Sequence, residues 1–251
     1  PKGAGFELAN PERFIWSVLA TDIDFGVDGG LYVLDWVQGW GVTGKGRIYR
    51  VFDPGLQGDP AIAETKKLLR EGMANRSPRE LGRLLASQDY RVRLDAQFEL
   101  VRRGEDGLRE LTRAARQSRD HAARLHGVWG LGQVLHQFRG QVTAFRARRD
   151  TVATLVALLA DASEQVRAQA AKVLGEARAG ESLAGLIQLA ADPDATVRFH
   201  AVMGLGKLNQ LSALPAILTV LRENNDADPL LRHAGVMALT SFRDRDTLNT
   251  L

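Results

Sequence analysis

The spacing of apolar residues divides the chain into two parts of different character. Over residues 1–54, apolar and polar positions alternate in short runs that are rich in aromatic and β-branched residues. This alternation is typical of half-buried strands, and it predicts strands at residues 18–25, 31–36 and 47–52. The turn Gly26-Val27-Asp28-Gly29-Gly30 should join the first two strands, because Asp-Gly readily adopts the positive φ angles of a tight hairpin.

From Ala61 onward the apolar residues follow the spacing of amphipathic helices, and five segments share one pattern centred on an arginine. The shared arginines, separated by 31, 43, 31 and 34 residues, are Arg93, Arg124, Arg167, Arg198 and Arg232. Four residues before each stands a helix N-cap candidate: Asp89, Asp120, Ser163, Asp194 and Asp228. The residue before the arginine is mostly aliphatic, the third after it is Ala or Gly and the seventh is Leu, which together form one apolar face.

A shorter amphipathic helix precedes each of these segments, and before the first of them Ser77-Pro78-Arg79-Glu80 is a capping box. Two antiparallel helices per unit of about 31 residues cannot bury their apolar faces alone, so the units are expected to stack. The predicted fold is therefore mainly α. It is an α-solenoid of about five helical repeats with a small N-terminal antiparallel β segment.

The predicted organisation has three parts. Residues 1–54 form the β segment, residues 55–76 a linker and a first helix, and residues 77–251 the repeats. The repeats are expected near residues 77–104, 105–136, 149–179, 181–210 and 212–243, with an insertion near residues 136–149 that accounts for the long separation.

The repeated units, such as SEQVRAQAAKVLG and DATVRFHAVMGLG, resemble short HEAT repeats of the kind found in bilin lyases, over about residues 64–251. The resemblance implies a ladder of Asp and Arg side chains that links neighbouring repeats. The matching arginines are the five named above, and the matching acids, six residues before their arginines, are Asp161, Asp192 and Asp226. The first two units carry Ser87 and Ser118 at this position, which predicts a weaker ladder at that end.

Gly39, Gly44 and Lys45 have the spacing of a nucleotide-binding P-loop. A P-loop, however, places Ser or Thr after the lysine and leads into a helix that holds phosphate. Here Gly46 follows, and the alternating run RIYRVF indicates a strand. We therefore interpret the loop as a turn between antiparallel strands.

The stretch ATDIDFGVDGGLYVLDWVQGWGVTGKGRIYRVF resembles the closing blade of the β-propeller in soluble sugar-dehydrogenase-like proteins. Followed by HEAT units, it is similar to the planctomycete-type large secreted proteins known as putative membrane-bound dehydrogenases. This resemblance implies a periplasmic or secreted parent protein. One blade is not a propeller, and the sequence has no C-x-x-C-H motif for a c-type haem.

Composition excludes several classes of protein. The chain has 251 residues, 45% of them hydrophobic and 25% charged, which indicates a folded domain. It has no cysteine, so disulfides, thiolate zinc sites and a cysteine nucleophile are absent. No apolar run is long enough to span a membrane. The chain starts at Pro1 without a signal sequence, and we expect it to be an excised piece of a longer protein.

Two groups of residues are candidates for metal binding. Asp22, Asp24, Asp28 and Asp35 could form a calcium loop, although Gly26 breaks the EF-hand pattern and a structural turn is favoured. The histidines, none paired at i, i+4, are His121, His126, His136, His200 and His233. We interpret them as solvent-facing, although His126 and His200 occupy equivalent positions and could line one groove. No metal or cofactor is predicted.

A basic stretch offers an alternative function in phosphate or nucleic-acid binding. Its arginines are Arg102, Arg103, Arg109, Arg113, Arg116, Arg119, Arg124, Arg139, Arg146, Arg148 and Arg149. The net charge of the chain is only +3, and Arg124 belongs to the ladder. A solvated or interdomain face is the favoured interpretation, and nucleic acid is not the favoured partner.

The position five residues after each shared arginine should face away from the core and be polar. It holds instead Phe98, Trp129, Lys172, Met203 and Met237. This face of a second helix lines the concave side of a solenoid, so another domain of the same parent chain or a protein partner could dock there. His126 and His200 complete the set of candidate partner-binding residues. If Trp129 and Met203 were fully buried, this hypothesis would fail.

The sequence thus favours a non-catalytic interaction module of a larger secreted protein. The alternatives are a fragment of a propeller-type sugar or alcohol dehydrogenase, and phosphate or nucleic-acid binding through residues 102–149.

Overall fold

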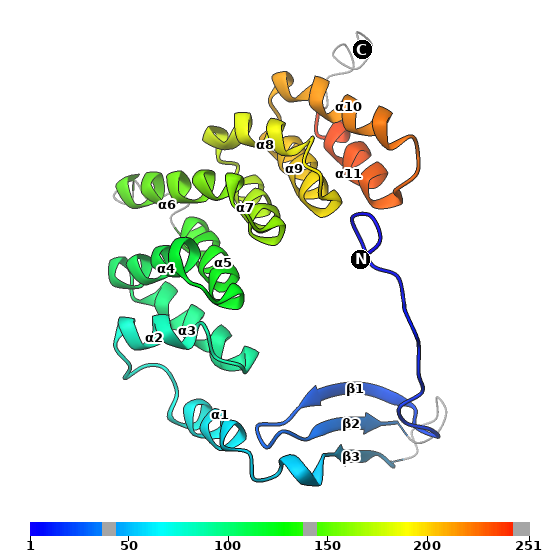
Figure 1. Cartoon of the computed structure of the whole chain (residues 1–251), viewed down its shortest axis with the longest axis vertical. Helices are drawn as coiled ribbons and strands as arrows, with labels where there is room; N and C mark the ends of the chain where they lie inside the picture. Colours follow the sequence, from blue (N-terminus) through cyan, green and yellow to red (C-terminus); the bar gives the residue numbers. More distant parts are fainter. Residues whose placement is uncertain (37–43, 138–144, 243–251) are drawn as a thin grey trace. The chain divides into compact units, whose positions relative to one another are not determined.

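The computed structural model describes residues 1–36, 44–137 and 145–242 and contains two units (Figure 1). The β unit comprises residues 8–75 and 89–92. The repeat unit comprises residues 1–7, 76–88 and those from 93 onward. Each unit is described by itself.

The β unit contains an antiparallel sheet of three strands in the order β1-β2-β3, which confirms the predicted strands. The strands are β1 (Ala20–Phe25), β2 (Leu31–Asp35) and β3 (Arg47–Val51). The predicted hairpin turn is also confirmed: Gly26 donates to the carbonyl of Gly30 at 2.8 Å, and Gly29 has a φ of +75°. A short 3-10 turn (Pro54–Leu56) and helix α1 (Pro60–Glu71), capped by Asp59, follow the sheet.

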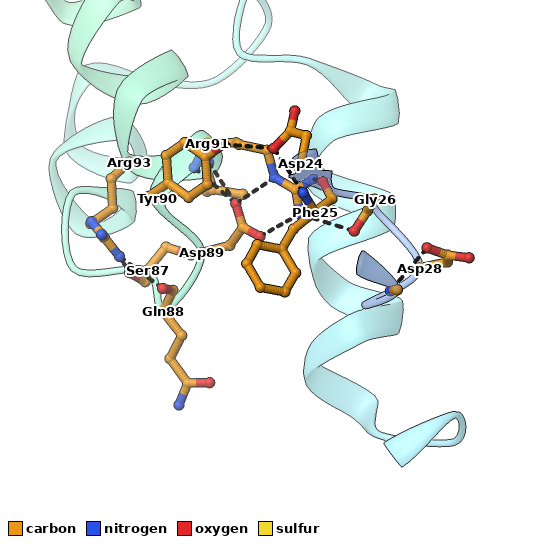
Figure 2. Close-up of polar contacts among 12 residues, drawn as sticks. Asp24, Phe25, Gly26, Asp28, Ser87, Gln88, Asp89, Tyr90, Arg91 and Arg93 are labelled. Atoms are coloured by element: carbon orange, nitrogen blue, oxygen red, sulfur yellow. Dashed lines mark hydrogen bonds and ion pairs between the residues drawn. The ribbon is translucent and has the colours of Figure 1, made fainter. Parts of the chain in front are cut away.

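Most of the sheet has no covering layer among the residues that the structure describes. The central Val33 is buried, but strand β1 is exposed along its whole length, and its Ile23 is 59% exposed. Residues 89–92 belong to the same unit and hold the hairpin turn. Arg91 pairs with Asp89 at 2.7 Å and donates hydrogen bonds to the carbonyl oxygens of Phe25 and Gly26 (Figure 2). The sheet depends on such polar contacts because it buries little apolar surface of its own.

The repeat unit contains five helix pairs within the part of the chain that the structure describes. The first helices are α2 (Pro78–Leu84), α4 (Glu105–Gln117), α6 (Phe145–Ala157), α8 (Leu183–Leu189) and α10 (Leu214–Asn224). The second helices are α3 (Tyr90–Arg102, whose first turn is counted with the β unit), α5 (His121–Gln137), α7 (Glu164–Glu176), α9 (Ala195–Leu208) and α11 (Pro229–Thr240). Figure 1 shows the second helices in an inner row and the first helices in an outer row. The predicted α-solenoid is confirmed.

The N-terminal signals of the helices are the ones that the sequence predicts. Ser77 and Glu80 form the capping box of α2. All five N-cap candidates of the second helices accept hydrogen bonds from backbone N–H groups of the first turn, as when Asp194 accepts from Val197 at 2.9 Å. Because the first turn of a helix has free N–H groups, these side chains fix where each second helix begins.

The predicted apolar face is the core of the repeat unit. The residues just before the shared arginines are buried in every repeat, and so are the leucines seven residues after the arginines, except the half-buried Leu239. Val236 of α11 is 49% exposed, although its equivalents in the other second helices are buried. Among the described residues no sixth helix pair covers α11, which explains the exposure at this end of the stack.

The predicted insertion is shorter than residues 136–149. Helix α5 continues to Gln137 and α6 begins at Phe145, so both ends of the predicted insertion are helical. The remaining residues, 138–144, lie outside the described part of the chain. The predicted insertion was too long because α5 and α6 each continue into polar residues beyond their apolar faces.

Candidate binding groove on the second helices

The structure brings together two of the predicted ladder pairs. Arg124 pairs with Asp161 of the next repeat, and Arg167 pairs with Asp192 through two hydrogen bonds of 2.8 and 3.0 Å. The hydrogen bonds that Arg167 donates to Asp192 raise the pKa of its guanidinium above the usual value. These pairs join the second to the third repeat and the third to the fourth.

Within the described residues, the other ladder arginines form no ion pair with a neighbouring repeat. Arg93 donates to the carbonyl oxygens of Ser87 and Gln88 in its own repeat (Figure 2), and Arg198 does the same with the carbonyls of Asp192 and Pro193. Arg232 pairs with Asp226 of its own repeat, and both side chains are exposed. In the part of the chain that the structure describes, the ladder of ion pairs thus joins the middle repeats.

Small residues determine how closely the second helices approach. A Cβ atom added at Gly175 of α7 would lie 2.6 Å from the Cα of Gly204 in α9, and one at Gly206 would lie equally close to the Cα of Ala238 in α11. Between α5 and α7 the contact is looser, because Gly132 faces the side chain of Val173. Helices α3 and α5 are bridged by long side chains, with Gln97 donating to Gln133 at 3.0 Å.

A groove of about 620 Å³ crosses the C-terminal halves of α3, α5 and α7, where the second helices are more widely spaced. Phe98, Trp129 and Lys172 line it from the same position of three successive repeats, and Gly132 lies among them. Phe98 is 42% exposed and Trp129 is half-buried. Met203 is also half-buried. Full burial of Trp129 and Met203 would have excluded the docking hypothesis, and neither residue is fully buried. Met203 and Met237 do not line this groove.

His126 lies beneath the groove and is buried, which corrects for this residue the expectation of a solvent-facing side chain. The histidines that are exposed, as expected, are His121, His136 and His233. Arg93 donates to the Nε2 atom of His126 at 3.2 Å, so Nδ1 carries the proton and donates to Gln97 at 2.8 Å. Its ring meets the ring of Trp129 edge-on, with 5.0 Å between the centroids. Trp129 in turn donates from Nε1 to Gln169 of α7 at 2.9 Å. This buried polar network orients the Trp129 ring.

Sequence reasoning missed the glutamines of this network. The signal was available, since Gln97 is the one polar residue at a position where the next three repeats hold Val128, Ala171 and Val202. A polar residue in an otherwise apolar column requires a hydrogen-bond partner when it is buried.

The burial of His126 predicts a loss of stability in mild acid. Desolvation first, and then the charge of Arg93, lower the pKa of His126 to about 4. The unfolded chain takes up this proton near pH 6.5 whereas the folded chain does not, so stability is present above pH 6.5 and is lost as the pH falls toward 4. We expect the free energy of unfolding to fall by about 2 kcal/mol from this residue between pH 7 and pH 5. Urea titrations at both pH values should show a smaller loss in His126→Gln than in the unchanged chain, and equal losses would contradict the prediction.

His200 is half-buried on α9 and packs against Phe199. Its pKa is also lowered to about 4, mainly by desolvation and further by Lys172 and Lys207. The two candidate histidines therefore belong to different surroundings, and neither lines the groove.

Among the described residues, the charged side chains that line the groove are two cations, Arg102 and Lys172, and one carboxylate, Glu176. Glu99 is the common partner of Arg102 and Arg103. Glu176 pairs with Lys207 at 3.8 Å. Lys172 has no carboxylate partner among the residues that the structure describes. An anionic group would be favoured at this site over a cationic one.

The basic stretch is mostly neutralised within the repeat unit. Arg109 and Arg113 pair with acidic residues three positions earlier, and Arg148 pairs with Glu181 at 3.8 Å. Arg146 and Arg149 both pair with Asp150. A phosphate-binding face requires cations that are free to contact the ligand, whereas most of the described arginines of this stretch pair with carboxylates.

The remaining candidates are structural. In the described residues no group of three or more His, Asp or Glu side chains could hold a metal ion. Asp28 stabilises the hairpin by accepting from Gly30, Tyr32 and Arg50, and the hydrogen bond from Gly30 is the largest cause of its lowered pKa. Most of the glycine-rich loop, including Gly39, lies outside the described residues, but the segment after Gly44 and Lys45 is strand β3, as predicted.

None of the helices in the described ranges has the length and apolar character that crossing a membrane requires.

Residues 152–227 match the family of HEAT repeats, and no curated protein matches the chain. A chain in the complex of CpcE and CpcF of phycocyanin lyase from Nostoc sp. PCC7120 is similar, with 17% identity, coverage of 70% of this chain and 69% of that one, and a TM-score of 0.52. An engineered protein of the Northeast Structural Genomics Consortium (19% identity, coverage 75% and 93%, TM-score 0.47) also matches. So does a designed armadillo repeat protein in complex with the peptide (KR)4 (18% identity, coverage 74% and 95%, TM-score 0.45). The fold is thus a HEAT-like α-solenoid, an architecture that typically presents surfaces for protein interaction.

Proposed function

We propose that this chain is a non-catalytic interaction module that holds another domain of its parent protein, or a protein partner, in the groove of α3, α5 and α7. The observation that carries the proposal is the half-exposed pair Phe98 and Trp129 on the inner row of helices. Partly exposed aromatic side chains are frequent anchors of protein interfaces. The buried network beneath Trp129 supports the same reading, because an anchor that is already oriented loses little entropy on binding.

We further propose that the β unit is the last blade of a propeller in a secreted or periplasmic parent protein of the sugar-dehydrogenase-like type. The exposed strand β1 and the exposed Ile23 support this, since a blade inside a propeller has neighbours on both faces. Any oxidoreductase activity then belongs to the complete propeller, and this chain contributes the docking surface.

Hydrogen exchange can test the docking function. We expect the amides in the C-terminal halves of α3, α5 and α7 to exchange at least tenfold more slowly in the full parent chain than in this chain alone, because a docked segment excludes water and suppresses local opening. The outer helices α4 and α10 provide the internal control and should exchange at the same rate in both. If the groove helices exchange equally fast in both chains, docking within the parent fails as the function.

A further inference from the structure

The shape, polar groups and charge of the groove of α3, α5 and α7 indicate what kind of ligand it binds. The inference below rests on the proposed docking function and deepens it.

The length of the groove fits an extended chain. The groove crosses three neighbouring helices. Packed helices lie about 8–10 Å apart, and these three are more widely spaced, so the long dimension of the groove is at least about 20 Å. A polypeptide in extended conformation advances about 3.3 Å per residue, so the groove can hold at least about six residues. A segment of this length can place alternate side chains toward the helices.

The lining offers a place for a large apolar side chain. Phe98 of α3 and Trp129 of α5 line the groove together, so an apolar side chain placed between them would contact both rings. Gln133 accepts from Gln97 through its oxygen, and its amide nitrogen can donate to a backbone carbonyl of a bound segment. A peptide supplies both the apolar side chain and the carbonyl.

The charge selects the flanking residues of such a segment. Lys172 lines the groove without a carboxylate partner among the described side chains, and Arg102 shares Glu99 with Arg103. A carboxylate beside the apolar anchor would pair with Lys172, whereas a lysine there would be repelled.

We propose that the groove binds an extended acidic peptide segment, with a large apolar side chain between Phe98 and Trp129 and a neighbouring Asp or Glu against Lys172. The acidic residue is set by charge complementarity, and the apolar residue by the aromatic walls. A segment with basic residues around the anchor is disfavoured.

A charge swap tests this inference directly. Two short dye-labelled Ser-Gly peptides serve as probes, one with a single Phe between two Asp residues and one with the same Phe between two Lys residues. By fluorescence anisotropy at low salt, we expect the unchanged chain to bind the Asp peptide about 5-fold more tightly than the Lys peptide. In Lys172→Glu the preference should reverse. The Asp preference should also weaken as salt is raised, because the pair is partly exposed.

Matched variants separate the charge from the apolar contact. Arg222→Glu makes the same change in charge sign on the exposed side of α10 and should keep the Asp preference. Phe98→Ala should weaken binding of both peptides without changing their order. A preference that stays the same in Lys172→Glu, or the absence of binding of either peptide to the unchanged chain, overturns the acidic-segment inference. The exchange experiment on the parent chain then still decides whether the groove is a docking site at all.

Discussion

Replacing Gly175 with Ala should lower the free energy of unfolding by about 3 kcal/mol. The new methyl group would lie 2.6 Å from the Cα of Gly204, and a backbone atom cannot move aside as the end of a side chain can. Helices α7 and α9 must therefore separate, which disrupts the core on both sides of the contact. For a chain of this size the midpoint of thermal unfolding should fall by roughly 6–12 °C, as measured by circular dichroism.

Gly180→Ala is the matched control for this prediction. A Cβ atom at Gly180 would contact only the side-chain amide of Gln210, at 3.3 Å. The same addition of one methyl group should therefore change the unfolding midpoint by no more than a degree or two. If both variants lose the same stability, the close approach of α7 and α9 does not determine the packing of the stack.

The helix N-caps, the buried helical faces and the hairpin turn show how much of the fold can be predicted from the sequence. N-caps such as Asp194 and the buried residues before each arginine depend on local hydrogen bonds and on one helical face, so the pattern of a single repeat is sufficient to find them. The hairpin turn at Gly29 was predictable for the same reason, since only the turn itself requires the positive φ.

The groove was harder to locate, because it depends on pairs of residues from different repeats. Gly175 and Gly204 bring α7 and α9 together, whereas Val173 keeps α5 farther away at Gly132. A single column of exposed positions predicted Phe98, Trp129 and Lys172 as neighbours but placed Met203 and Met237 in the same surface. The burial of His126 depends on Gln97 of the preceding repeat, and this pairing appears only when the helices are stacked.

The ion pair between Arg167 and Asp192 should contribute strongly to stability, in contrast to most pairs on this surface. The two side chains are only 15% and 6% exposed, and their contact is bidentate. Asp192→Ala leaves the Arg167 guanidinium partly buried without its counter-charge, and it also removes the acceptor of the Asp194 N–H. We expect the free energy of unfolding to fall by about 3 kcal/mol in urea titrations.

Asp226→Asn provides the control, because it removes the charge at the equivalent position of the fifth repeat, and Asn tolerates the positive φ of +65° found there. Arg232 and Asp226 are 53% and 67% exposed, so water and salt already screen their attraction. The loss there should be at most about 0.5 kcal/mol. A difference of this size between equivalent residues would show that an Asp–Arg motif stabilises the solenoid only where the arginine reaches across to the next repeat. Equal losses would mean instead that both pairs act within their own loops, and that stacking alone holds the repeats together.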